Sequence, residues 1–329
     1  MGKREESTAP GRERLKADLA LLAVAAIWGS AFVAQRAAAD HLGPFVYNGA
    51  RFLLAVVVML PFVARRGWRI PRAEWRGGAL AGLLLFTASA LQQAGLAFTT
   101  AGKAGFITGL YVVLVPLFMA LGWRRWPRWS AWGASLLSAG GLFLLSTGGT
   151  SLQLAPGDGL ELVGAVFWAL HVILIGRLAA QVDVLRLAWV QYLVCGVLAL
   201  GVGLVFERHT LGGFGAAWWA VVYTAVFSIG LGYTLQALGQ RLAPPTDAAV
   251  ILSGEAVFAA LAGWVLLGEA LTTLQLVGGG LMLGGMVLAQ VGRRQEARSR
   301  RQDAGSKKQD AGSRGDDCAA AGGGGVSGV

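Results

Sequence analysis

Ten stretches of roughly twenty apolar residues follow one another along this 329-residue chain, and they constrain its fold more than any other feature. A helix needs about 20 apolar residues to cross the ~30 Å hydrocarbon core of a membrane. The stretches occupy residues 18–36, 45–64, 77–98, 103–122, 129–147, 158–177, 184–206, 214–239, 246–267 and 272–292. Because the runs are continuous rather than alternating, they exclude a transmembrane barrel. We therefore predict an all-α integral membrane protein with ten transmembrane helices.

The composition agrees with this prediction and excludes several other classes of protein. Only 14% of the residues are charged, whereas soluble domains have about 25%. A disordered chain, a coiled coil and an ordinary soluble enzyme are therefore excluded. The two cysteines, Cys195 and Cys318, form no disulfide framework, and the three histidines are too scattered for haem or zinc. We expect no cofactor and no metal.

The positions of the basic residues predict how the helices are oriented. If both chain ends lie on one side of the membrane, 24 of the 28 Lys and Arg residues fall on that side and three on the other. Lys and Arg are enriched in cytoplasmic loops. We therefore expect a multi-pass protein of the cell inner membrane with both termini in the cytoplasm. The net charge of +10 then reflects topology, which removes nucleic acid as an expected partner.

The two ends of the chain differ from the membrane-spanning part. Residues 1–17 are a charged arm without a convincing cleavage site, so we interpret them as a cytoplasmic segment and not as a signal peptide. From residue 293 the chain repeats Gln-Asp-Ala-Gly-Ser and ends in a glycine run. We predict that 293–329 is a disordered cytoplasmic tail, whose basic residues could attract anionic membrane lipid weakly.

The two halves of the chain resemble each other. Residues 18–147 and 158–292 each contain five predicted spans, and similar residues recur at a nearly constant offset. The matches pair Trp28 with Trp168, Gln92 with Gln236, Thr108 with Ser253, Gly133 with Gly278, and Gly140 with Gly285. Five is an odd number, so the second unit must enter the membrane in the opposite direction. We predict two inverted five-helix repeats, the common plan of secondary transporters, with a substrate site between them near the membrane midplane.

A series of short motifs occurs in order along the ten spans. They are Trp28-Gly29-Ser30, Arg51-Phe52, the stretch from Thr99 to Phe106 leading to Pro116, then Pro244, Ser253, Glu255, Gly268-Glu269 and the glycine-rich last span. None of these features is specific alone, but their order within ten spans is. In this order they resemble the EamA family of the drug/metabolite transporter superfamily, over about residues 18–292. The second unit has Trp168-Ala169 in place of the Trp-Gly pair, so it is the more diverged copy.

The resemblance implies a function and a helix arrangement. It implies an inner-membrane carrier that exports amino acids, other small metabolites or drug-like compounds by alternating access, with possible coupling to protons. It also implies that spans 3, 4, 8 and 9 surround a central cavity, with spans 1, 2, 6 and 7 outside them. An importer or exchanger of the same fold is an alternative within transporters. A multi-span membrane enzyme is the alternative from another class, but we find no phosphate loop, no pair of intramembrane aspartates and no catalytic residues.

Three Asp, Glu, Lys, Arg or His residues lie inside predicted spans away from the span ends, where a charge is costly and so indicates function. Glu255 lies near the midplane, where it could bind a substrate amine or carry a proton, or pair structurally with Arg51 or a neighbouring hydroxyl. Arg51 lies in the outer third of span 2, and either gates and contacts an anionic substrate group or extends to the outer surface. His171 either relays protons or donates to a backbone carbonyl.

Polar but uncharged side chains inside the spans complete the predicted substrate site. They are Trp28, Gln92, Thr108, Tyr111, Trp168, Gln236 and Ser253. Any one of them could instead hold helices together. Gln92 and Gln236 are the more informative pair, because they occupy matched positions in the two repeats. With the three ionisable residues, these seven form the set that we expect to contact a small-molecule substrate.

Four smaller features give further expectations. Pro116 should interrupt span 4 beside the cavity, since proline frees a backbone carbonyl. Asp247 is interpreted as a residue at a helix N-terminus, and Glu161 should reach water near the outer end of span 6. Gly280 and Gly284 form a small-residue face that could pack within the monomer or form a homodimer.

Overall fold

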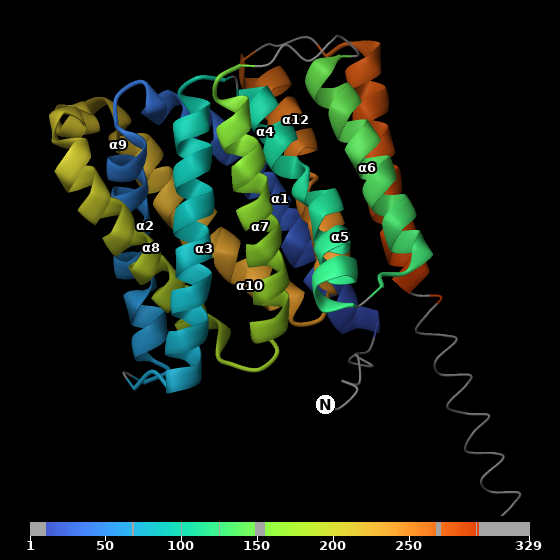
Figure 1. Ribbon diagram of the computed structural model, residues 1–329, viewed down its shortest axis with the longest axis horizontal. Coiled ribbons are helices and arrows are strands. Elements are labelled where there is room, and N and C mark those ends of the chain that lie inside the picture. The colour runs from blue at the N-terminus through green and yellow to red at the C-terminus, as the bar shows by residue number, and fades with distance from the viewer. Residues whose placement is uncertain are drawn as a thin grey trace, which may run out of the picture.

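The computed structural model describes residues 11–67, 69–99, 101–124, 126–148, 155–267, 271–293 and 295. The predicted disordered tail, apart from residues 293 and 295, and the first ten residues of the arm lie outside this part. Within it, the chain is a bundle of long helices, and no strand is found (Figure 1). The all-helical membrane fold predicted from the apolar stretches is confirmed.

The first half contains six helices that make five spans. They are α1 Gly11–Ala39, α2 Pro44–Ala64, α3 Arg72–Leu96, α4 Ala101–Gly109, α5 Tyr111–Trp123 and α6 Trp129–Thr147. Pro44 begins α2, where its missing N–H leaves no unsatisfied donor. The carboxylate of Glu207, from the second half, accepts hydrogen bonds from the backbone N–H groups of Phe45 and Val46, both at 2.9 Å. This contact satisfies two further donors at the start of α2.

The second half follows the same order. It comprises α7 Asp158–Leu178, α8 Val184–Phe206, the short 3-10 turn η1 Arg208–Gly213, α9 Phe214–Tyr223, the π-helical segment η2 Thr224–Tyr233, α10 Thr234–Gln240, α11 Pro245–Leu252, α12 Glu255–Leu267 and a last helix Thr273–Arg293. Nine spans in the described residues are long and apolar enough to cross a membrane. The tenth, α6, has 19 residues, but its Gly, Ser and Trp residues make it less apolar.

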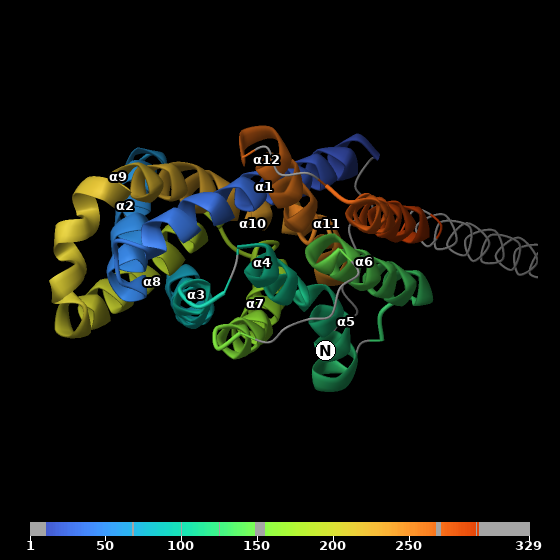
Figure 2. The same cartoon turned by 90° about the horizontal axis from the view of Figure 1, so that it is seen from above.

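Spans from the two halves pack against each other in pairs. Helices α2 and α8 lie side by side, as do α3 and α7, and α6 lies against the last helix (Figures 1 and 2). Glycines allow the backbones to approach closely. A side chain added at Gly49 of α2 would meet Leu200 of α8 at 2.6 Å, and one at Gly278 would meet the backbone of Gly141 at 2.5 Å. The two repeats therefore form one interlocked core.

Two spans are broken near their middle, at positions matched between the repeats. Span 4 is interrupted at Leu110, between α4 and α5, and span 9 at Ser253 and Gly254, between α11 and α12. Backbone N–H groups next to both breaks bond to carbonyls three residues earlier, which tightens the chain. The interruption expected at Pro116 is wrong, because α5 continues past that residue.

The glycines of the last helix divide between two faces. Gly278 and Gly285 face α6, where added side chains would meet Gly141 and Ser138. A side chain added at Gly280 would have no described neighbour within 4 Å, and one at Gly284 would meet only Leu137, at 3.6 Å. The last helix therefore packs against α6 through the face that carries Gly278 and Gly285, and not through the expected face that carries Gly280 and Gly284. A homodimer formed through the second face stays a prediction.

Candidate functional site

The breaks in spans 4 and 9 border a cavity between the two halves. It contains about 520 Å³ of atom-free space, part of it open to solvent. The lining residues come from nine described helices or segments, and they are Trp28, Phe32, Gln35, Arg51, Gln92, Thr108, Tyr111, Trp168, Val172, Ser228, Ile229, Tyr233, Gln236 and Glu255. Discontinuous helices around a midplane cavity are the usual plan of a transporter site, because the freed backbone groups can face a substrate.

Among the described residues, the cavity wall contains one cationic and one acidic side chain. Arg51, on α2, is 3% exposed, and it donates to the side-chain oxygens of Asn48 at 3.0 Å and Gln35 at 2.9 Å. Its guanidinium also lies 4.8 Å from the centre of the Tyr47 ring. The alternative that Arg51 extends to the outer surface is therefore wrong.

Glu255 lies at the start of α12, immediately after the break in span 9. Its carboxylate accepts a hydrogen bond, at 3.3 Å, from the hydroxyl of Tyr111. Tyr111 itself follows directly after the break in span 4. Of the two structural partners considered for Glu255, the structure therefore shows the neighbouring hydroxyl, and within the described residues it shows no ion pair with Arg51. Arg51 and Glu255 thus give the site one positive and one negative side chain, and each of them is hydrogen-bonded to uncharged side chains.

Aromatic side chains form much of the remaining wall. The rings of Trp28 and Trp168, from matched spans of the two repeats, lie 4.8 and 6.2 Å from the ring of Tyr233. The Trp28 indole N–H donates to the backbone oxygen of Ser228, at 3.0 Å, within the π-helical segment. Wide helical turns of this kind are frequent at functional sites. The arrangement offers flat apolar surfaces beside two charged groups.

Several buried polar atoms at the cavity have no partner among the described residues. Gln236 is 1% exposed, yet both its amide nitrogen and its amide oxygen lack a hydrogen bond, as does the indole nitrogen of Trp168. Gln92, the repeat counterpart of Gln236, does have a partner, because its amide donates to the Thr108 hydroxyl at 3.1 Å. Buried polar groups are nearly always hydrogen-bonded. The unpaired atoms at the wall are therefore available to a ligand.

Eight of the ten residues selected from the sequence line this one cavity, and two do not. His171 is fully buried behind the wall, where a ring nitrogen lies 3.0 Å from the side-chain oxygen of Gln191 and the ring contacts Trp168 and Tyr233. The Ser253 hydroxyl donates to the backbone oxygen of Val250 at 2.8 Å, at the helix break. Neither side chain faces the space that a substrate would enter.

The helix arrangement implied by the family resemblance needs correction. Spans 1, 2 and 6 were expected outside the four central spans, yet they contribute Trp28, Arg51 and Trp168 to the wall. Tyr233 was not selected from the sequence, although it contacts both tryptophans. The local sequence contains no signal for Tyr233, because the tryptophans that it contacts come from distant parts of the chain.

Glu161 differs from expectation, whereas Asp247 lies at a helix N-terminus as expected. Glu161 was expected to reach water, but its side chain is fully buried. Asp247 does lie in the first turn of α11, and it also pairs with Arg128 at 2.5 Å and lies 3.7 Å from Arg293. Arg293 in turn contacts Asp18 of α1. These four side chains connect α1, α6, α11 and the last helix at the end of the bundle where α1 begins, which we call the terminal end.

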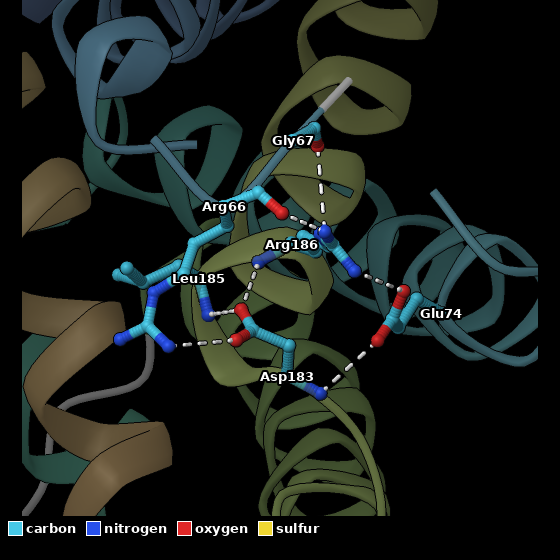
Figure 3. Close-up of polar contacts among 6 residues, drawn as sticks. All are labelled: Arg66, Gly67, Glu74, Asp183, Leu185 and Arg186. Carbon is cyan, nitrogen blue, oxygen red and sulfur yellow. Dashed lines mark hydrogen bonds and ion pairs between the residues drawn. The ribbon is translucent and has the colours of Figure 1, made fainter. Parts of the chain in front are cut away.

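A second charged cluster lies at the terminal end, between the loops that join α2 to α3 and α7 to α8 (Figure 3). The Asp183 side chain caps α8 by accepting from the backbone of Leu185 and Arg186, and it lies 3.6 Å from the Arg66 guanidinium. Arg186 reaches back to Glu74, at 3.8 Å, and to the backbone oxygen of Arg66. The two halves are thus tied together at this end.

The sequence is similar, over most of its length, to those of proteins named as uncharacterized transporters. It is 32% identical over 292 residues to an uncharacterized transporter from Archaeoglobus fulgidus, covering 88% of this chain and 90% of the relative. It is 26% identical over 291 residues to the uncharacterized inner membrane transporter YedA of Escherichia coli K12, covering 83% and 90%. A solved structure at 20% identity covers 85% of this chain and 98% of its own, with a TM-score of 0.72, so the fold is shared.

The family comparison agrees with the division into two halves. The EamA-like transporter family matches this chain twice, over residues 15–147 and 155–290, as a family of two five-helix repeats would. The resemblance that was noted in the sequence is thereby confirmed, together with the membrane-transport class. This multi-pass membrane chain belongs to the EamA-like transporter family.

Proposed function

We propose that this protein is an inner-membrane secondary transporter that exports small zwitterionic metabolites, above all amino acids with apolar or aromatic side chains. The observation that carries the proposal is the composition of the cavity wall. It has one guanidinium, Arg51, one carboxylate, Glu255, an aromatic surface and the unpaired amide of Gln236.

Each group in the wall matches one part of such a substrate. A guanidinium suits a carboxylate because its planar donors can bind both oxygens. Glu255 would attract the amine, and Gln236 would donate to or accept from the substrate backbone. The rings of Trp28, Trp168 and Tyr233 would cover an apolar side chain. Phosphorylated substrates fit poorly, because Arg51 is the one cationic residue that lines the cavity among the described residues.

Alternating access would follow from the packing of the repeats. The paired spans hold the cavity between two similar units, and rocking of one unit against the other would expose it to each side in turn. The charged clusters at the terminal end would have to separate when the cavity opens there. Export is the direction that the family resemblance implies.

The direct test is counterflow in proteoliposomes. Vesicles preloaded with unlabelled phenylalanine or leucine should take up the labelled amino acid faster than protein-free vesicles. Glu255→Gln and Gln236→Leu should each weaken apparent affinity by about tenfold, since a hydrogen bond to a charged group contributes ~1.5–3 kcal/mol. Glu13→Gln and Gln181→Leu change exposed residues of the same types, and they serve as matched controls.

The choice of substrates makes the test decisive. Decarboxylated and deaminated analogues of the transported amino acid should compete poorly, because each lacks one of the two charges. Full competition by both analogues would contradict recognition of a zwitterion. Counterflow with none of the amino acids would contradict the proposed substrate class.

A further inference from the structure

Glu161 is a buried carboxylate placed directly behind the cavity wall. It lies in the first turn of α7, and its side chain is fully inaccessible to solvent. The hydroxyl of Thr108, a residue of the wall, donates to Oε2 of Glu161 at 2.9 Å. The second carboxylate oxygen, Oε1, has no hydrogen-bond partner among the described residues.

Two glycines shape the space that holds this carboxylate. A side chain added at Gly95 of α3 would lie 2.9 Å from both Cγ and Oε1 of Glu161. A side chain added at Gly157 would lie 2.3 Å from the backbone oxygen of Gly95. The backbones of α3 and α7 therefore meet closely beside Glu161. Any larger residue at position 95 would displace the carboxyl group.

A chain of hydrogen bonds joins Glu161 to the cavity. The Gln92 amide donates to Thr108, and Thr108 donates to Glu161, so both donors point toward the carboxylate. Gln92 and Thr108 each line the cavity. A change in the charge of Glu161 would alter which groups donate and which accept in this series of hydrogen bonds. The Gln92 amide can present either its oxygen or its NH₂ group to a substrate.

Among the described residues, few charged or titratable side chains lie on the helices that pack around Glu161. Asp158, one turn earlier on α7, accepts from Thr99 at 2.8 Å and from a backbone N–H, and it lies between Glu161 and the loop. The acidic residue of α3, Glu74, is at the terminal end of that helix. On α4 and α5 the titratable groups are Lys103, whose side chain lies outside the described residues, and Tyr111, which donates to Glu255.

We propose that Glu161 is a proton-binding site, and that Thr108 and Gln92 couple its protonation to the substrate cavity. An anionic carboxylate with one neutral hydrogen bond is unfavourable within a membrane-embedded bundle, and a bound proton removes that charge. The Thr108 hydroxyl can donate to the anion or accept from the protonated acid. The role of this proton in transport rests on the proposed function, whereas its binding to Glu161 does not.

Infrared difference spectroscopy of the full-length protein in lipid tests the site itself. We expect an absorption band of a protonated carboxyl group at acidic pH that disappears as the pH rises. The band should be absent from Glu161→Gln and present in Glu255→Gln. Thr108→Val keeps the volume but removes the hydrogen bond, so it should shift the frequency of the band. A band that is unchanged in Glu161→Gln would overturn the proposal. If Glu161→Gln cannot be purified, a carboxyl band in Thr108→Val at the same frequency as in the parent protein would overturn the proposal.

Transport measurements test the coupling. In vesicles with an imposed pH gradient, Glu161→Gln should lose uphill accumulation of the amino acid and keep counterflow. Retention of uphill accumulation would contradict coupling through Glu161. Absence of counterflow in the parent protein would contradict the proposed substrate class, while the infrared result would still decide whether Glu161 binds a proton.

Discussion

The carboxylate of Asp247 lies 2.5 Å from the guanidinium of Arg128, which joins the start of α11 to the start of α6 at the terminal end of the bundle. Asp247 is 2% exposed and Arg128 is 20% exposed at the side chain. The pair therefore connects one of the two broken spans to a helix of the other repeat, in surroundings where loss of either partner leaves a charge largely buried.

We expect Arg128→Gln to destabilise the protein by about 3 kcal/mol, because the buried Asp247 carboxylate would keep only its longer contact with Arg293, at 3.7 Å. Asp247→Asn should cost less, since the more exposed Arg128 can be hydrated. Thermal unfolding in detergent measures both. Glu13→Gln, which breaks the exposed pair with Lys16, should change stability by less than ~1 kcal/mol. Equal losses of stability in all three variants would show that the buried pair stabilises the protein no more than the exposed pair does.

The accessibility of the cavity can be measured with cysteine substitutions in a background without Cys195 and Cys318. Cysteine at Gln92, Tyr111, Gln236 and Glu255 should react with a small polar thiol reagent, because all four positions line the cavity. Cysteine at His171 is the control, since that side chain lies behind Trp168 and Tyr233. Protection of all four cavity positions, or equal reactivity at His171, would contradict this arrangement.

The packing of α6 on the last helix gives a prediction about two glycines. Gly278→Leu should destabilise the protein by at least ~1–3 kcal/mol, because its side chain would meet the backbone of Gly141. Gly280→Leu should be tolerated, since no described atom lies within 4 Å of the added carbon. Unfolding midpoints of the two variants provide the comparison. A change in oligomeric state in Gly280→Leu alone would instead identify that face as a contact between two copies.

The orientation of the chain can be tested with reporter fusions. A reporter joined at Val329 should be active in the cytoplasm, and one inserted near Gly149 should be active on the other side. The reason is the excess of Lys and Arg on the side that carries both termini. Cytoplasmic activity at both positions would contradict an odd number of spans between them.

The sequence by itself determined the number of spans and their approximate ends. Hydropathy depends on about twenty neighbouring residues, so it can be summed along the chain without knowing any partner. Helices α6 and α8, for example, begin and end where the apolar stretches predicted. The repeat offset also matched Thr108 with Ser253; Ser253 lies at the break in span 9, and Thr108 lies two residues before the break in span 4 at Leu110. Eight of ten site residues came from polar groups within apolar runs, a signal that is equally local.

Only the tertiary structure decided which of these groups share one space. Tyr233 belongs to the site because Trp28 and Trp168 pack against it from two other spans, and no local pattern records such contacts. Glu161 is near the end of its span, which predicted exposure, yet the contact between Gly95 and Gly157 closes α3 over it. The burial of a side chain depends on the neighbours that distant segments supply. The local sequence therefore identifies the polar residues of a membrane helix, whereas the packing of the two repeats determines what each of them faces.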